Sequence, residues 1–186
     1  MFGELTQQQF FDTAMHVAID AQDGIAQAIR SVIEDHAQMP NDMPATVVGY
    51  FDKEDSQLRV VEAPAPHWST AEEKAEWVED IKYGCKELNA LYCIVITGAW
   101  VAKGEGADIV MKSEGRMRVS ELPANLREDV ILLHMSCARG DRLVMFEATK
   151  DSEVHDTGVC DESNQLDGDM IGFIERAPRN TTITDA

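Results

Sequence analysis

The chain has few aromatic residues and no long apolar run. Only 6% of its 186 residues are Phe, Trp or Tyr, although 44% are hydrophobic. A core built from this chain must therefore rely on Ile, Val, Leu, Met and Ala. No stretch of about 18 apolar residues is present, which argues against an ordinary membrane-spanning helix. The length suits one domain with a single hydrophobic core.

Basic residues are scarce and unevenly placed. The chain has 16 Lys and Arg against 34 Asp and Glu, a net charge of −18. Residues 1–62 and 151–186 are strongly acidic, whereas residues 103–150 hold eight acidic and eight basic side chains. Nucleic acids and anionic membranes attract Lys and Arg, so neither is expected as a partner. The acidic ends favour high solubility or a basic protein partner.

Features of secreted proteins and of known catalytic sites are missing. The first 15 residues lack the basic and apolar regions of a secretory signal, and the four cysteines form no CxxC pair. Reduced thiols and a cytoplasmic location are therefore expected. The chain also has no GxSxG elbow and no GxxxxGK[ST] loop. We expect no cofactor, and interpret the chain first as a non-enzymatic acidic accessory or protein-interaction protein.

Two helices are predicted from apolar spacing and from their first residues. Thr6 and Gln9 have the spacing of a capping box, and apolar residues then recur at helical period through residue 33. A second helix begins at the same spacing of Ser69 and Glu72. The interval between these helices is long enough for one β-hairpin.

Strands are predicted where short apolar or alternating runs occur. Residues 103–127 and 149–169 are expected to be irregular. The expected strands are residues 46–51, 57–62, 91–101, 130–137, 142–148 and, less regular, 170–174.

The order of these elements predicts a single α+β domain. It reads αββαβββ with a further strand at the end, over residues 1–176, and residues 177–186 are expected to form a flexible tail. We predict a mostly antiparallel sheet with both helices packed on one face. The apolar hairpin at residues 130–148 is a candidate sheet edge for a homodimer, which stays open as an alternative.

Two His and two Cys residues are the best candidates for a metal site. His134, Cys137, His155 and Cys160 have the composition of a zinc site, but their spacing is unlike that of paired zinc ligands. On a strand, His134 and Cys137 point to opposite faces because side chains alternate. We therefore interpret Cys137 as a buried thiol and His134 as partly exposed, and expect no metal.

An enzyme remains the alternative to an interaction protein. It would be a small hydrolase or transferase with its site near the end of the central strand and the loop at residues 103–127. The candidate catalytic residues are His134, Arg127 and Glu128, and Trp100 is the candidate ligand-binding residue. Arg127 and Glu128 are adjacent, so on a strand they would face opposite ways.

Residues 98–148 carry a recurring order of short motifs. A strand ends in Ala99-Trp100, a loop holds Ser120, Pro123, Arg127 and Glu128, and the hairpin runs VILLHMSC and LVMFEA follow. This order resembles an uncharacterised family of small α+β proteins from phages and bacteria. Gly98 stands where that family has Glu, and the spacing from Pro123 to Arg127 is longer. The resemblance implies the αββαβββ layout and implies no activity.

Overall fold

One six-stranded sheet dominates the computed structural model, which describes residues 6–36, 44–64, 70–114, 116–149, 153–160 and 173–174. The helices are α1 (Gln7–His36), α2 (Ala71–Glu87) and α3 (Glu105–Lys112), with short 3-10 turns at Val119–Glu121 and Ala124–Leu126. The strands are β1 (Pro44–Asp52), β2 (Gln57–Pro64), β3 (Ala90–Ala102), β4 (Arg127–Cys137), β5 (Gly140–Glu147) and β6 (Val154–Asp156).

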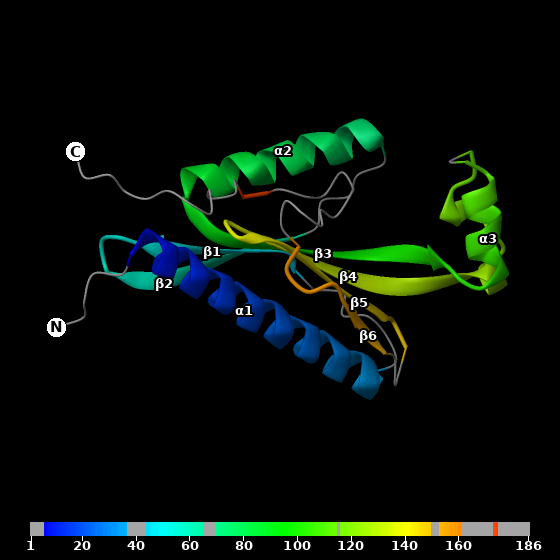
Figure 1. Cartoon of the computed structure of the whole chain (residues 1–186), viewed down its shortest axis with the longest axis horizontal. Coiled ribbons are helices and arrows are strands. Elements are labelled where there is room, and N and C mark those ends of the chain that lie inside the picture. The colour runs from blue at the N-terminus through cyan, green and yellow to red at the C-terminus, as the bar shows by residue number, and fades with distance from the viewer. Residues whose placement is uncertain are drawn as a thin grey trace.

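Every neighbouring pair of strands in the sheet is antiparallel. The spatial order is β2-β1-β3-β4-β5-β6, so β3 and β4 lie at the centre (Figure 1). The α+β class and the antiparallel sheet are therefore confirmed. The hairpin at residues 130–148 does not provide a free edge, because β4 lies between two strands and β5 pairs with β6. The edges of the described sheet are β2 and β6.

The two long helices cover opposite faces of the sheet (Figure 1), so the expectation that they share one face is wrong. Val47 belongs to the core cluster under α1, whereas Val48, its neighbour on β1, belongs to the cluster under α2. The physical reason lies in β3, where Ile94 and Val95 are both buried although they point to opposite faces. A strand that is apolar on both sides needs a cover on each.

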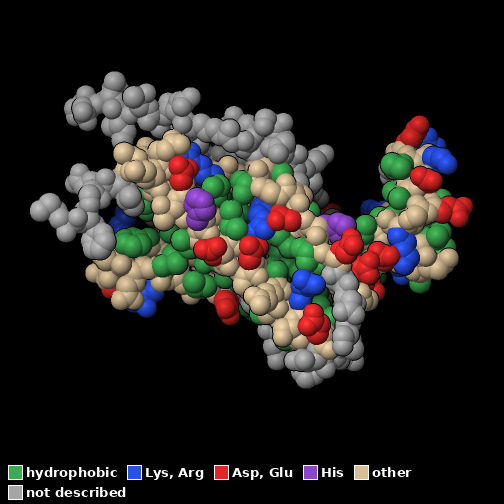
Figure 2. Space-filling view, turned by 60° about the horizontal axis from the view of Figure 1, so that its bottom comes forward, with side chains coloured by type: hydrophobic (Ala, Val, Ile, Leu, Met, Phe, Trp, Pro, Cys, Tyr) green, Lys and Arg blue, Asp and Glu red, His purple; other side chains and the backbone are tan. Residues whose placement is uncertain are grey.

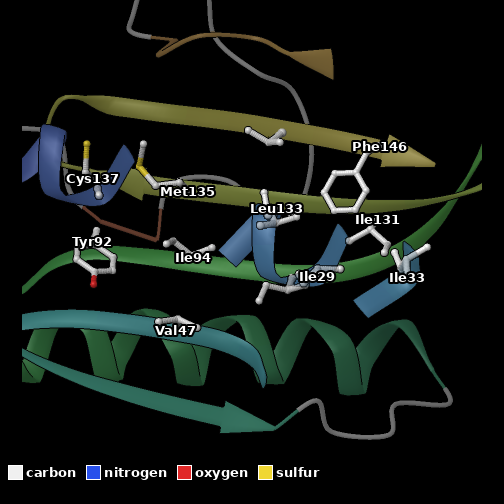
Figure 3. Packing of buried hydrophobic residues seen from close by; sticks show 14 residues of the cluster. Ile29, Ile33, Val47, Tyr92, Ile94, Ile131, Leu133, Met135, Cys137 and Phe146 are labelled. Atoms are coloured by element: carbon white, nitrogen blue, oxygen red, sulfur yellow. The ribbon is translucent and has the colours of Figure 1, made fainter. Parts of the chain in front are cut away.

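Among the described residues, the α1 face holds the larger core. Buried positions on α1 recur every three or four residues and form one stripe: Ala14, Ala18, Gln22, Ala26, Ile29 and Ile33. Figure 3 shows Ile29 and Ile33 in the same cluster as Ile131 of β4 and Phe146 of β5. Small alanines let the helix approach the sheet closely, so the isoleucines at its other end can interdigitate with the strands.

Capping boxes begin both long helices. At α1 the backbone N–H of Gln9 donates to Oγ1 of Thr6, and the Gln9 side chain accepts from the Thr6 N–H, as predicted. At α2 the cap is Thr70 with Glu73, one residue later than the predicted Ser69 and Glu72. The sequence holds two overlapping boxes here, so the pattern alone could not choose the frame.

Residues 100–129 project from the sheet and are called the arm from here on (Figure 1). β1 pairs with β3 only as far as Val95, and β5 pairs with β4 only from Val130. Beyond these points β3 and β4 continue as a two-stranded ribbon. The tip contains α3 and both 3-10 turns, so the prediction that residues 103–127 are irregular is wrong.

Close packing within the arm explains its compact tip. Gly106 is buried, and a Cβ there would lie 2.4 Å from the carbonyl oxygen of Leu126. Leu122 is also buried, and the backbone N–H of Lys103 donates to that same Leu126 oxygen at 3.0 Å. Glycine is needed at position 106 because the backbone of the second turn passes directly over α3.

Several predictions fall partly or wholly outside the described residues. The tail at 177–186 lies outside them, and of the strand expected at 170–174 only residues 173–174 are described, as a bend. The short strand β6 falls within the stretch that was expected to be irregular. None of the described helices combines the length and hydropathy required to cross a membrane.

Candidate functional site

The four candidate zinc ligands do not converge. Cys137 is buried in the core under α1, and His134 lies on the opposite face of β4. His155 is exposed on the edge strand β6, and Cys160 forms an isolated bridge with Asp141. Among the described residues, no group of three or more His, Cys, Asp or Glu side chains is arranged to hold a metal ion.

His134 is buried, in contrast to the predicted partial exposure. The residue is 8% exposed, and its ring faces Phe173 at a centroid distance of 6.0 Å. Nε2 lies 3.2 Å from Oδ1 of Asp141 on β5, but neither ring nitrogen makes a hydrogen bond with a described residue. Ser136, two residues along β4, accepts a hydrogen bond from the backbone of Ile174. Residues 173–174 therefore cover His134.

Trp100 and Arg127 meet on one side of the arm. The Arg127 guanidinium carbon lies 4.4 Å from the centroid of the Trp100 ring, and its Nη1 donates to the carbonyl of Ser120 at 2.6 Å. Glu128 points away and pairs with Lys103 at 2.8 Å. That ion pair lowers the pKa of Glu128 and raises the pKa of Lys103. Arg127 and Glu128 thus face opposite ways, as their adjacency predicted.

The candidate catalytic residues do not share a pocket. His134 is opposite Val95 on β3, whereas Arg127 is opposite Ala102, seven residues further along. At about 3.3 Å per residue, this separation along the strand is roughly 23 Å. The alternative of an enzyme built from His134, Arg127 and Glu128 gains no support from this arrangement.

A cavity of about 860 Å³ lies between the start of α1 and the second half of α2, where six segments of the chain meet. Sequence reasoning did not find it, because its lining comes from residues far apart along the chain. Its walls are mostly apolar and its polar lining is chiefly lysine. It is lined by Phe10, Phe11, Ala14, Phe51, Lys53, Glu79, Lys82, Tyr83, Cys85, Lys86, Asn89, Ala90, Leu91, Ala138, Phe173 and Ile174.

One thiol lines this cavity and interacts with a second thiol in the core behind it. Cys85 of α2 lines it, and Cys93 of β3 belongs to the same core cluster. Both are free and buried. Their hydrogen bond lowers the pKa of Cys85 and raises the pKa of Cys93, to which burial also contributes. Cys85 is therefore the more easily ionised of the two thiols.

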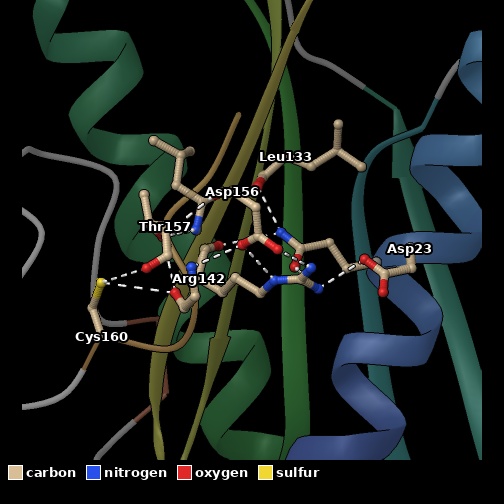
Figure 4. A network of polar contacts seen from close by, with 9 residues as sticks. Asp23, Leu133, Arg142, Asp156, Thr157 and Cys160 are labelled. Carbon is tan, nitrogen blue, oxygen red and sulfur yellow. Dashed lines mark hydrogen bonds and ion pairs between the residues drawn. The ribbon is translucent and has the colours of Figure 1, made fainter. Parts of the chain in front are cut away.

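A polar network joins α1 to β5 and β6 on the other face (Figure 4). Arg142 donates from Nε and Nη2 to both carboxylate oxygens of Asp156, at 2.9 and 2.6 Å. Its Nη1 donates to Asp23 and to the buried Gln22. Gln22 in turn donates to the carbonyls of Leu133 and Arg142. Every polar atom named here has a partner, which is typical of a structural clamp.

No family model, curated protein or solved structure matches the chain. The resemblance of residues 98–148 to the phage and bacterial family therefore stays a prediction. The described residues themselves define the class: an α+β protein with one antiparallel sheet, a long helix on each face, a cavity between the start of α1 and the second half of α2, and an arm at one end.

Proposed function

We propose that this is a protein-interaction protein, and that the arm is the surface that docks its partner. The observation that supports this most is Trp100, a large aromatic side chain that is 48% exposed on a projecting ribbon. Tryptophan and arginine are the residues most enriched among those that dominate binding energy at interfaces. Met111, 70% exposed on α3, adds a second apolar contact near the tip.

Trp100 is held in place before any partner arrives. Arg127 stacks over its ring, and Arg127 is itself tied to the carbonyl of Ser120. A side chain that is already ordered loses little conformational entropy on binding, so more of its contact energy contributes to affinity. The exposed ring is therefore better suited to docking than a freely rotating one.

Charge differs between the arm and the whole chain. Residues 100–129 hold five basic and six acidic side chains, whereas the chain as a whole has a net charge of −18. Figure 2 shows acidic and basic side chains mixed over the projecting end of the molecule. Such an arm suits an apolar contact with a mixed polar rim, and the acidic body would attract a basic partner and speed its association.

Comparative capture from a lysate of the source cell tests this proposal. Tagged wild type, Trp100→Ala and Leu58→Ala are used as baits, and the bound proteins are quantified by mass spectrometry. Leu58 is the matched control, because it is 44% exposed on β2 and belongs neither to the arm nor to the cavity lining. We expect a protein whose recovery falls at least tenfold with Trp100→Ala and is unchanged with Leu58→Ala.

A second arm of the experiment addresses charge. Capture of the same protein should weaken as salt is raised, because screening shortens the range of the acidic field. A set of captured proteins that is the same for wild type and Trp100→Ala would contradict docking through the arm.

A further inference from the structure

The described lining of the cavity beside α2 carries a net positive charge in a negatively charged protein. Among the described residues it contains Lys53, Lys82 and Lys86 but only one acidic residue, Glu79, which gives a net charge of +2. Glu79 is already engaged, because its Oε1 accepts from Nζ of Lys82 at 2.9 Å. Among the ion pairs of the described residues, none involves Lys53 or Lys86. Two ammonium groups at the cavity are thus available to an anion.

Apolar side chains form the rest of the wall. Phe11 and Leu91 are half-buried along it, Phe173 is buried, and Phe51 is 44% exposed at the end of β1. Aromatic and aliphatic surface of this kind binds the hydrocarbon part of a ligand through the hydrophobic effect. A volume of about 860 Å³ lies within the usual range for small-molecule sites and is too small for a folded partner.

We propose that this cavity binds an amphipathic carboxylate, a molecule with a hydrocarbon body and one anionic head group such as a fatty acid. The body packs against the aromatic and aliphatic wall, and the carboxylate pairs with Lys53 and Lys86. Charge complementarity supports this occupant, because the described lining carries a net positive charge within a chain of net charge −18. A neutral ligand would leave the two ammonium groups unused.

This site is independent of the arm. Ala90 and Leu91 line the cavity at the N-terminal end of β3, whereas Trp100 lies near the C-terminal end of the same strand. Substitutions at one end are therefore not expected to alter binding at the other.

Calorimetric titration of the full chain with decanoate, and with decan-1-ol as its neutral counterpart, tests the proposal. Both probes are kept below the concentrations at which they aggregate. We expect one equivalent of decanoate to bind, with an affinity at least tenfold higher than that of the alcohol. The Lys53→Gln/Lys86→Gln variant should lose at least tenfold in affinity for decanoate and keep its affinity for decan-1-ol.

Two further variants separate local charge and cavity volume from general effects. Lys74→Gln/Lys112→Gln removes the same charge from positions outside the cavity lining, and should bind decanoate like wild type. Ala138→Trp places an indole at the cavity from the turn between β4 and β5, and should abolish binding of both probes. Circular dichroism and thermal unfolding confirm that each variant is folded.

The outcomes of these titrations test ligand binding in the cavity separately from docking through the arm. Absence of saturable decanoate binding to wild type overturns it, and so does equal decanoate affinity in wild type and Lys53→Gln/Lys86→Gln. Trp100→Ala should bind decanoate normally, while Lys53→Gln/Lys86→Gln should retain the protein captured through the arm. Failure of either site thus leaves the other test intact.

Discussion

The described parts of the two faces of the sheet differ in the size of their cores. Among the described residues, 14 buried side chains form one cluster under α1, whereas the cluster under α2 contains six. The cavity of about 860 Å³ is lined by Cys85 and Phe173 of that smaller cluster, and also by Phe10, Phe11 and Ala14 at the start of α1. Dense packing is what makes a protein interior stable and unique, so the larger core should supply most of the stability.

The two faces also differ in whether their buried polar groups are hydrogen-bonded. On the α1 face, Gln22 and Arg142 are hydrogen-bonded throughout the network that joins α1, β5 and β6. On the α2 face, Oγ1 of Thr46 and both ring nitrogens of His134 are buried without a hydrogen-bond partner among the described residues. An unsatisfied buried polar atom costs free energy, and such sites are tolerated where a structure is not optimised for stability alone.

The largest expected difference in stability is between alanine substitutions of two phenylalanines. Phe146→Ala removes a fully buried ring from the α1 core and should lower the free energy of unfolding by about 3–5 kcal/mol. Phe173→Ala removes a ring that already borders the cavity, so fewer packing contacts are lost. It should lower the free energy of unfolding by less than about 2 kcal/mol. Urea denaturation of both variants measures this, and equal losses would contradict the division between the faces.

A smaller effect is expected from the polar clamp. Arg142→Ala leaves Gln22, Asp23 and Asp156 without a shared partner and should cost about 2 kcal/mol. The loss is smaller than for a fully buried pair, because the side chains of Asp23 and Asp156 are 55% and 41% exposed. Urea denaturation at neutral pH measures the loss. Asp12→Ala, which removes one of the two acceptors of Arg139, is the control on the same face.

The clamp also predicts a pH dependence. Its hydrogen bonds from Arg142 lower the pKa of Asp156 below the ordinary value of 3.8, and the backbone N–H of Gly158 acts in the same direction. The stabilisation is therefore fully present above that ordinary value, and is lost as the pH falls through the lowered value of the folded state. In Arg142→Ala only the hydrogen bond from Gly158 remains, so the free energy of unfolding should fall less steeply than in wild type below about pH 4. Parallel slopes would show that Asp156 is not stabilised by the clamp.

The sequence predicted most of the strands, but it did not predict which face of the sheet each helix covers. The alternation in β4 correctly separated Leu133 and Cys137 from His134, because a period of two directly encodes which side chains share a face. The apolar stripe of a helix shows only that it packs against something, so it could not show that α1 and α2 lie on opposite sides. β6 was missed because its three residues are all exposed, and it is held in place by pairing with β5.

The candidate sites divide in a similar way. Trp100 stood out because it ends an apolar run, and it is exposed on the arm. Its contact with Arg127, 27 positions further along, depends on the register of β3 and β4, which no local pattern encodes. The cavity depends on six segments meeting, and Gln22 is a buried polar residue within an apolar stripe. Such features come from tertiary packing between distant segments, which the periodicity of the sequence does not encode.

The smallest predicted effect tests the less complete face directly. Thr46 is 1% exposed, and its Oγ1 has no hydrogen-bond partner among the described residues. Thr46→Val replaces the hydroxyl with a methyl group of similar size, and valine also favours strands, so the variant should be more stable by about 1 kcal/mol. Urea denaturation measures this change in stability. Thr97→Val, at a half-buried position on the neighbouring strand β3, is the control. If Thr46→Val lowers the free energy of unfolding, the hydroxyl contributes to stability, and the α2 face is as fully satisfied as the face under α1.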